Sequence, residues 1–435
     1  MLKARQQQAL SDHNPIAIGI GSDDDSFNVV ILGKDKKILL HACYHNQGST
    51  REHSILCNTL ISLFTSLPNA IRSHIVAISI NYIPELHPKY QRYRKPTLSN
   101  EERLLTIKDS KQAQINQSLT YDRTSVLISK ENPFQILHSL NYRKGSFSPE
   151  EYQLRQKADW LMGWLLNNWQ WVEESNSLKW GWSIREQSWM GWPLDKSWIR
   201  GSGDVVSTGS VIGSIATERA SMLGLSDGCL IIASTNNDNA GVIANLPKNA
   251  DSIVVLNNKL SLNCRVEIPL ISDKIINYRL GQNWIAQGLS RAGTEVLKYI
   301  FPYKMINDLC RQIDPNIPSG IFHYPLVNKG EDFPIDHRNL VPLIEPCPIS
   351  NSLYLHALLE GLANIEYAGL RKMQKLSSIT LSRVVTLGHG ASNSQWKSLR
   401  QRIVSVEIQN KSSIMPSMGL ALLALHGFYH ALGIR

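Results

Sequence analysis

The sequence predicts an α/β protein with two domains, from its length, its composition and the alternation of two kinds of segment. The chain has 435 residues, which is enough for two hydrophobic cores. Hydrophobic residues make up 43% of the chain and charged residues 19%, as is ordinary for a globular protein. Short apolar segments typical of strands alternate with segments whose apolar residues recur at helical spacing. Such alternation is typical of α/β proteins.

The composition argues against a secreted, membrane or nucleic-acid-binding protein. No apolar run is long enough to cross a bilayer, and residues 1–15 lack the apolar region of a secretory signal. The six cysteines form no C-x-x-C pair, which favours free thiols in a reducing cytosol, and we therefore expect a cytoplasmic protein. The net charge of +9 comes from scattered residues. The densest basic cluster, residues 89–95, predicts a solvated loop, with a polyanion contact as the alternative.

The first segments of the chain predict a sheet covered by a helix. Residues 16–32 have apolar positions on both sides of a polar turn, which is typical of a β-hairpin, and residues 34–44 continue as a third strand. Residues 52–67 carry apolar side chains at helical spacing, and residues 75–80 form a buried strand. Residues 84–118 are polar, basic and contain proline, so we expect a loop with a poorly defined helix there.

Three consecutive aspartates, Asp23, Asp24 and Asp25, occupy the turn of the first hairpin. Two like charges about 4 Å apart repel each other by about 4 kcal/mol at an effective dielectric constant of about 20. A cation would reverse this repulsion, so Asp23 and Asp24 are candidate ligands for Mg²⁺ or Ca²⁺. A solvated acidic turn and a shifted phosphate-binding loop are the alternatives.

Residues 151–199 contain nine of the eleven tryptophans. Within this region, residues 157–166 (KADWLMGWLL) have the spacing of a helix. A tryptophan cluster can form a dense hydrophobic core, or it can form a platform on which a sugar ring stacks. Both interpretations are open at this point.

Residues 209–244 predict a helix, a buried strand and a second helix. The first helix covers residues 217–223 and ends at Gly224, and the strand covers residues 229–233. A polar turn, residues 234–239, leads to a helix of small residues that begins near residue 240.

The second half of the chain repeats this alternation. Residues 257–259 form the turn of a predicted hairpin, in which asparagine can adopt a positive φ. Residues 353–376 have the spacing of a long helix. Residues 384–396 (VVTLGHGASNSQW) predict a strand, a glycine turn and the start of a helix, and residues 419–432 predict a last helix.

The order of these segments resembles the FGGY family of carbohydrate kinases over about residues 14–432. Residues matching the family's motifs recur through the second half of the chain: Gly288, Gly293, Gly320, Pro325, Gly330, Glu331, Pro334, Glu360, Gly361, Gly388, Gly390, Ala391 and Asn393. Within the family, the spacing is most similar to the ribulose and xylulose kinase-like proteins of cyanobacteria and plant plastids. Arg291 and Asp332 depart from the motifs, where a small polar residue and an arginine are usual.

The resemblance implies two actin-like ATPase (ribonuclease H-like) domains, each with a mixed five-stranded sheet, and a cleft between them. Residues 14–244 would form a sugar-binding domain that the C-terminal helix, residues 416–435, completes. Residues 245–415 would form a nucleotide-binding domain. The implied reaction is phosphorylation of a pentulose or related sugar with ATP and Mg²⁺. The implied partners are a sugar and ATP, without nucleic acid or membrane, and a homodimer is left open.

Several departures from the family's motifs predict impaired catalysis. The catalytic aspartate of the family falls on Asn237, and a carboxylate that contacts the sugar falls on Asn81. Gly21 stands where an aspartate would orient the metal, and residues 257–259 replace a small phosphate-binding turn. A general base contributes typically 10²–10⁴-fold to such a reaction, and asparagine cannot accept a proton at neutral pH.

We therefore expect either a pseudokinase or an active kinase that uses Asp238 as its general base. In both cases the resemblance places Asn81, Tyr82 and Asp238 at the sugar and Asn237 at the reacting hydroxyl. The resemblance places six residues at a nucleotide: Gly288, Gly293, Gly388, Gly390, Ala391 and Asn393.

Overall fold

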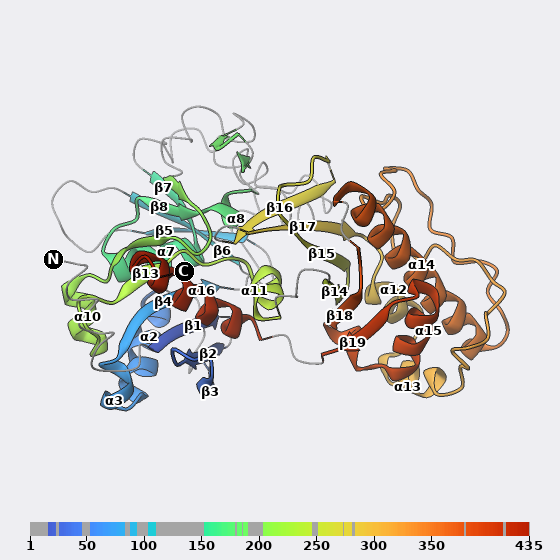
Figure 1. The fold of residues 1–435 in the computed structure, drawn as a ribbon, viewed down its shortest axis with the longest axis horizontal. Helices are drawn as coiled ribbons and strands as arrows, with labels where there is room; N and C mark the ends of the chain where they lie inside the picture. Colours follow the sequence, from blue (N-terminus) through green and yellow to red (C-terminus); the bar gives the residue numbers. More distant parts are fainter. Residues whose placement is uncertain are drawn as a thin grey trace. The chain divides into compact units, whose positions relative to one another are not determined.

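A computed structural model describes residues 16–22, 26–45, 53–82, 88–93, 103–109, 152–178, 181–184, 186–189, 203–245, 251–272, 274–280, 283–377, 380–411 and 415–434. The chain separates into two compact units (Figure 1). Unit 1 comprises Met1–Ala244 and Met415–Arg435, and unit 2 comprises Asn245–Ile414. Both units combine a mixed sheet with helices, which confirms the predicted α/β class. None of the helices within the described ranges is long and apolar enough to cross a membrane.

The main sheet of unit 1 has the strand order β12-β13-β4-β1-β2-β3. Its strands are β1 (Ile16–Ser22), β2 (Ser26–Leu32), β3 (Ile38–His45), β4 (Ile75–Tyr82), β12 (Val211–Ser214) and β13 (Leu230–Ile232). β1, β2 and β3 form an antiparallel meander, as their alternating apolar residues predict, and β4 and β13 continue the sheet in parallel to β1.

Helices cover both faces of this sheet. The described helices of unit 1 are α2 (His53–Ser66), α3 (Asn69–Arg72), α7 (Lys157–Leu166), α8 (Glu174–Ser177), α10 (Thr217–Leu223), α11 (Asn237–Ala244) and α16 (Pro416–Ala431). α2 and α7 bury their apolar residues against one face in a single core. α16 packs against the opposite face, where Gly19 of β1 lies so close that a Cβ atom would be 2.1 Å from the Ser417 carbonyl oxygen.

Three smaller sheets complete the described part of unit 1. Their strands are β5 (Pro88–Tyr93), β6 (Arg103–Asp109) and β7 (Tyr152–Gln156), then β8 (Trp171–Glu173) with β11 (Asp204–Val206), and β9 (Trp182–Ser183) with β10 (Ser188–Trp189). The expected loop and helix in residues 84–118 are therefore wrong where this segment is described. β6 pairs with β7, which is more than forty residues later in the chain, and such a pairing leaves no local pattern.

The sheet of unit 2 has the order β16-β17-β15-β14-β18-β19 and repeats the plan of unit 1. Its strands are β14 (Asp251–Leu256), β15 (Leu260–Val266), β16 (Ile275–Leu280), β17 (Asn283–Ser290), β18 (Arg383–Leu387) and β19 (Glu407–Asn410). In both units three antiparallel strands precede two parallel ones. Each sheet has six strands rather than the expected five, because β12 and β16 each add an antiparallel strand at an edge.

One long helix dominates the core of unit 2. The helices of this unit are α12 (Thr294–Ile300), α13 (Tyr303–Cys310), α14 (Asn351–Ser377), the 3₁₀-helix η2 (His389–Ser392) and α15 (Ser394–Val404). α14 confirms the helix predicted for residues 353–376, and its apolar face packs on the sheet. A buried ion pair joins α14 to α15, with two 2.6 Å contacts between the Arg400 guanidinium and the Glu366 carboxylate.

Several of the described tryptophans and most of the cysteines are core residues. Trp160, Trp164 and Trp169 are buried in the core of unit 1, as the core interpretation predicts. Trp182 and Trp189 are half-buried on the β9–β10 hairpin, and their rings meet edge to face at 5.4 Å. All six cysteines are free, and four of them are buried.

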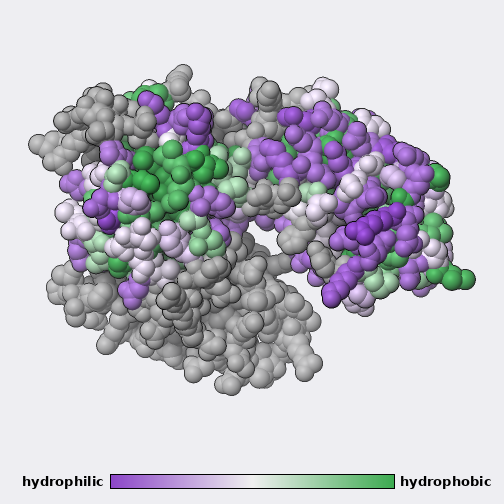
Figure 2. Space-filling view, turned by 90° about the horizontal axis from the view of Figure 1, so that it is seen from below, coloured by the Kyte–Doolittle hydropathy of each residue, from purple (hydrophilic) through white to green (hydrophobic). Residues whose placement is uncertain are grey.

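Hydrophobic residues also reach the surface of unit 1. A space-filling view shows them gathered on one face of this unit, whereas unit 2 presents mainly hydrophilic residues in the same view (Figure 2). Exposed apolar side chains of unit 1 include Ile38 and Leu39 on the edge strand β3 and Met222 on α10. β3 contains no Asp, Glu, Lys or Arg, and charged residues are one means by which proteins protect a strand edge.

Candidate functional site

The candidate site of unit 1 lies at the carboxyl edge of its main sheet. β1, β4 and β13 run parallel, so their carboxyl ends lie at the same edge. In open α/β sheets this edge is where ligands bind. β1 reaches it at Gly21, β4 at Asn81, and β13 continues there into the turn that begins α11.

Two residues that the sequence placed at a sugar meet at this edge. The Asn81 side-chain amide donates a hydrogen bond of 3.0 Å to Asn237 Oδ1. Asn81 is 2% exposed, and Asn237 is half-buried. An amide pair can donate and accept hydrogen bonds, but it carries no charge.

α11 begins three residues earlier than the sequence predicts, at Asn237 rather than at residue 240. The reason is a helix cap, because the Asn236 side chain accepts a 2.9 Å hydrogen bond from the Asn239 N–H. Asp238 therefore lies in the first turn of α11 and is exposed, while Asn239 is buried. Neighbouring residues of a helix point about 100° apart, so the Asp238 side chain does not point where Asn237 points.

Three predicted site residues lie wholly or partly outside the described part of the chain. Asp23 and Asp24 lie outside the described residues, so their role as metal ligands remains a prediction. Tyr82 ends β4, and only its backbone is described. Within the ranges that are described, no three side chains of His, Cys, Asp or Glu gather in a way that could hold a metal ion.

A buried polar network that sequence reasoning missed contacts the turn before α11. The Glu173 carboxylate is 0% exposed and accepts hydrogen bonds from the hydroxyls of Ser175 and Thr208, both at 2.5 Å. The Ser175 hydroxyl lies 3.1 Å from the Thr235 hydroxyl, in the turn between β13 and α11. Burial raises the pKa of the Glu173 carboxyl to about 8, although these hydrogen bonds act to lower it. The one local feature that could have pointed to Glu173 is its position directly before the short helix α8, where an acidic residue can act as a helix cap.

Unit 2 presents a corresponding edge, where the predicted nucleotide-binding glycines lie. β14 and β18 run parallel and end at Leu256 and Leu387. Gly388 follows β18 with φ 91°, and a Cβ atom there would be 2.6 Å from Asn257 Oδ1. A Cβ atom on Gly390 would be 2.6 Å from the Trp396 ring. Both glycines therefore permit close packing within unit 2 itself.

The hairpin turn of residues 257–259 caps α12 with its own backbone. The Asn257 carbonyl accepts a 2.8 Å hydrogen bond from the Thr294 N–H, and the Asn258 carbonyl accepts one of 3.4 Å from the Glu295 N–H. A helix N-terminus can bind phosphate when its N–H groups are available. These groups already have partners, so they do not fit a phosphate cradle. The hairpin is confirmed, and neither asparagine uses the positive φ that was open to it.

The remaining predicted nucleotide residues also have structural roles. A Cβ atom on Gly288 would be 2.5 Å from the Phe333 ring, and one on Gly293 would be 2.2 Å from the Asn258 carbonyl oxygen. Ala391 is buried. Asn393 caps α15 by accepting a 2.8 Å hydrogen bond from the Trp396 N–H. Contact of these residues with a nucleotide remains a prediction.

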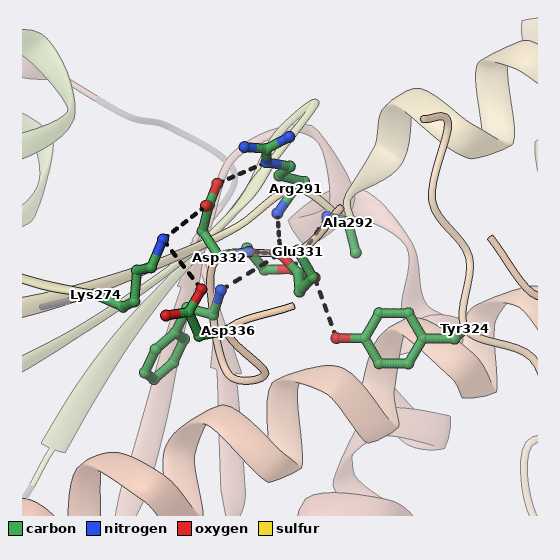
Figure 3. A network of polar contacts seen from close by, with 9 residues as sticks. Lys274, Arg291, Ala292, Tyr324, Glu331, Asp332 and Asp336 are labelled. Carbon is green, nitrogen blue, oxygen red and sulfur yellow. Dashed lines mark hydrogen bonds and ion pairs between the residues drawn. The ribbon is translucent and has the colours of Figure 1, made fainter. Parts of the chain in front are cut away.

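The two other departures from the family motifs face each other in unit 2 (Figure 3). Arg291 Nε donates a 2.6 Å hydrogen bond to Asp332, and Lys274 pairs with the same carboxylate at 3.2 Å. Burial raises the pKa of Asp332, but these two cations outweigh it and hold the pKa below its usual value. The neighbouring Glu331 is buried and accepts hydrogen bonds from Ser290 Oγ (2.7 Å) and the Arg291 N–H (2.8 Å). The loop is thus tied to the end of β17.

Comparison with solved structures finds the same fold in carbohydrate kinases. The xylulose kinase from Rhodospirillum rubrum matches with a TM-score of 0.71 at 12% identity, over 96% of this chain and 92% of that one. A xylulose kinase from Brucella ovis matches with 0.70 at 14% identity, over 95% and 91%. The glycerol kinase from Plasmodium falciparum, solved with ADP, matches with 0.67 at 13% identity, over 96% and 90%.

The chain has the actin-like ATPase fold of the FGGY carbohydrate kinases. The predicted fold is therefore confirmed. A scan against models of protein families finds no match to the chain. At 12–14% identity, the similarity to these structures shows a shared fold.

Proposed function

We propose that this protein is a sugar- or polyol-binding pseudokinase. It keeps the sugar-kinase fold and a polar site on unit 1, and it does not transfer phosphate at the rate of a sugar kinase. The observation that carries the proposal is the hydrogen bond between Asn81 and Asn237 at the carboxyl edge of the unit 1 sheet. The ligand class follows from the sugar kinases of the same fold, among them the two xylulose kinases.

The chemistry of two facing amides supports binding without proton transfer. Each amide offers both donors and an acceptor, which suits the hydroxyls of a neutral sugar. Neither amide can accept the hydroxyl proton that must leave when phosphate is transferred. Loss of a general base typically lowers the rate 10²–10⁴-fold.

The arrangement in unit 2 supports the same conclusion from the nucleotide side. Phosphoryl transfer depends on backbone N–H groups and cations that hold the phosphates in position. At the start of α12, the N–H groups of Thr294 and Glu295 donate to carbonyls of the 257–259 turn instead. We therefore expect weaker binding of ATP than of a sugar.

An active kinase is the second candidate, and the position of Asp238 favours it. Asp238 is an exposed carboxylate one residue after Asn237, in the first turn of α11. As a base it would accept the hydroxyl proton of a pentulose in an ATP- and Mg²⁺-dependent reaction. The ribulose and xylulose kinase-like proteins remain the expected relatives in that case.

The proposal predicts that Asn237, and not Asp238, determines sugar binding. Asn237→Ala removes the acceptor of the Asn81 amide, so we expect the affinity for D-ribulose or D-xylulose to fall about tenfold or more, the equivalent of one to two hydrogen bonds. Asp238→Ala is the matched control on the next position of the same helix turn, and its affinity should equal that of the wild type. Isothermal titration calorimetry of the three proteins measures both effects.

The opposite ranking would overturn the proposal. If Asp238→Ala loses binding and Asn237→Ala retains it, Asp238 is the residue that faces the sugar. If the wild type binds neither ketose nor a polyol panel at millimolar concentration, the sugar-binding claim is wrong. Circular dichroism of each variant verifies that the fold is intact.

A further inference from the structure

The Glu173 carboxylate is buried at the junction of β8 and α8 and is bound by more donors than a helix cap needs. It caps α8 by accepting from the backbone N–H groups of Ser175 (2.8 Å) and Asn176 (3.0 Å). It also accepts from the hydroxyls of Ser175 and Thr208, both at 2.5 Å. A capping residue satisfies its helix with the backbone bonds alone. The two hydroxyl bonds therefore indicate a second role.

The Ser175 hydroxyl connects this carboxylate to the candidate site. Its oxygen lies 3.1 Å from the Thr235 hydroxyl, and Thr235 Oγ1 accepts a 3.3 Å hydrogen bond from the Asn239 side-chain amide. Glu173, Ser175, Thr235 and Asn239 are all at least 95% buried. Three consecutive hydrogen bonds thus run from α8 to α11.

When it is ionised, the Glu173 carboxylate accepts hydrogen bonds only, and it then fixes the direction of this hydrogen-bond chain. A hydroxyl has one hydrogen, and that of Ser175 is donated to Glu173 Oε2, which also accepts from the Asn176 N–H. Ser175 Oγ can then only accept from Thr235, so the Thr235 hydrogen points to Ser175. The lone pairs of Thr235 are left for the Asn239 amide, which donates to them. With Glu173 ionised, every hydrogen bond from Asn239 through Thr235 and Ser175 points toward Glu173.

At its end remote from Glu173, the hydrogen-bond chain holds the turn that presents Asn237. Thr235 lies two residues before Asn237, and Asn239 lies two residues after it. The Asn239 backbone N–H is in turn bound by the Asn236 side chain. With residues on both sides fixed, the Asn237 side chain is directed at the Asn81 amide.

We infer that Glu173 is a positioning residue for the sugar site: through Ser175 and Thr235 it holds the β13–α11 turn so that Asn237 faces Asn81. This inference rests on the proposed function for its ligand, D-ribulose or D-xylulose. The orientation of the two asparagines can be measured without any ligand.

The experiment compares variants that break the hydrogen-bond chain with a variant that removes only the Thr208–Glu173 hydrogen bond. Ser175→Ala and Thr235→Val each remove one hydroxyl of the chain, and Ser175→Ala leaves the backbone cap on Glu173 in place. Thr208→Ala removes the other hydroxyl bound to Glu173, outside the chain, and is the matched control. Thr235→Ser keeps the hydroxyl and is the conservative rescue. The readouts are the side-chain amide resonance of Asn81 in protein labelled with ¹⁵N-asparagine, assigned by its loss in Asn81→Ser, and the ketose Kd.

We expect Ser175→Ala and Thr235→Val to shift the Asn81 amide resonance toward that of a solvated asparagine and to raise the Kd about tenfold. Thr208→Ala and Thr235→Ser should match the wild type in both readouts. The inference is overturned if the resonance is unchanged in Ser175→Ala and Thr235→Val, or if Thr208→Ala shifts it equally. If the wild type binds no ketose, the proposed function fails, and the amide resonance still decides this inference.

Discussion

Replacing Gly419 with alanine will destabilise unit 1 by about 3 kcal/mol or more, the upper range for overpacking a core. A Cβ atom at this position would be 1.8 Å from the Ala240 carbonyl oxygen, which belongs to the backbone of α11 and cannot rotate away. α16 would have to move off α11 and off the sheet beneath it, including Gly19. Urea unfolding, with hydrogen exchange at α16 to locate the change, measures the loss.

Gly228→Ala is the control for this prediction. Its added Cβ atom would meet nothing nearer than the Ser226 hydroxyl at 3.7 Å, which is an ordinary contact. Its stability should stay within about 0.5 kcal/mol of the wild type. Equal stability of Gly419→Ala and Gly228→Ala would mean that α16 does not approach α11 as described.

Replacing Glu366 with alanine will destabilise unit 2 by about 3–5 kcal/mol, because it leaves the Arg400 guanidinium buried without its counter-ion. Arg400 and Glu366 are each 1% exposed, and their two contacts are 2.6 Å long. Arg400 Nε and Nη2 both donate to Glu366, and the buried Nη1 has no hydrogen-bond partner among the described residues. Urea unfolding followed by hydrogen exchange at α14 and α15 measures the effect.

The double variant Glu366→Leu with Arg400→Met is the matched comparison. It replaces both charges with apolar side chains of similar size, so it should recover most of the stability. If the double variant is as unstable as Glu366→Ala, packing rather than the unpaired charge causes the loss. If Glu366→Ala is as stable as the wild type, the ion pair is not buried.

The predicted elements that the structure confirms are those with a strong local pattern. The antiparallel hairpin of β1 and β2 follows from alternating apolar residues, and α14 follows from apolar residues at helical spacing. The end of α10 at Gly224, which has φ 68°, follows from the conformational freedom of glycine. Each of these patterns lies within a few residues of the feature that it predicts.

The features that the sequence did not predict depend on contacts between distant segments. The strands β12 and β16 exist because a neighbouring strand is available for pairing at the sheet edge. α11 starts three residues before the predicted position because Asn236 caps it. In the sequence alone, this asparagine is equally compatible with a polar turn. Arg291 and Asp332, which look like separate departures from a motif, form one ion pair across forty-one residues.

The candidate site was predicted only in part for the same reason. Asn81 and Asn237 were both expected near a sugar, and their hydrogen bond joins residues 156 positions apart. Glu173 was missed, because its link to Thr235 passes through Ser175, sixty residues before Thr235. No local pattern contains such a chain of contacts.

The most direct test of the pseudokinase proposal is ADP release from Mg-ATP in the presence of a panel of pentuloses and polyols. The proposal predicts that none of them raises the rate above that measured without sugar, in the wild type or in Asp238→Ala. Rapid ADP release by the wild type with any one of these sugars, abolished in Asp238→Ala, would contradict it and would identify an active kinase.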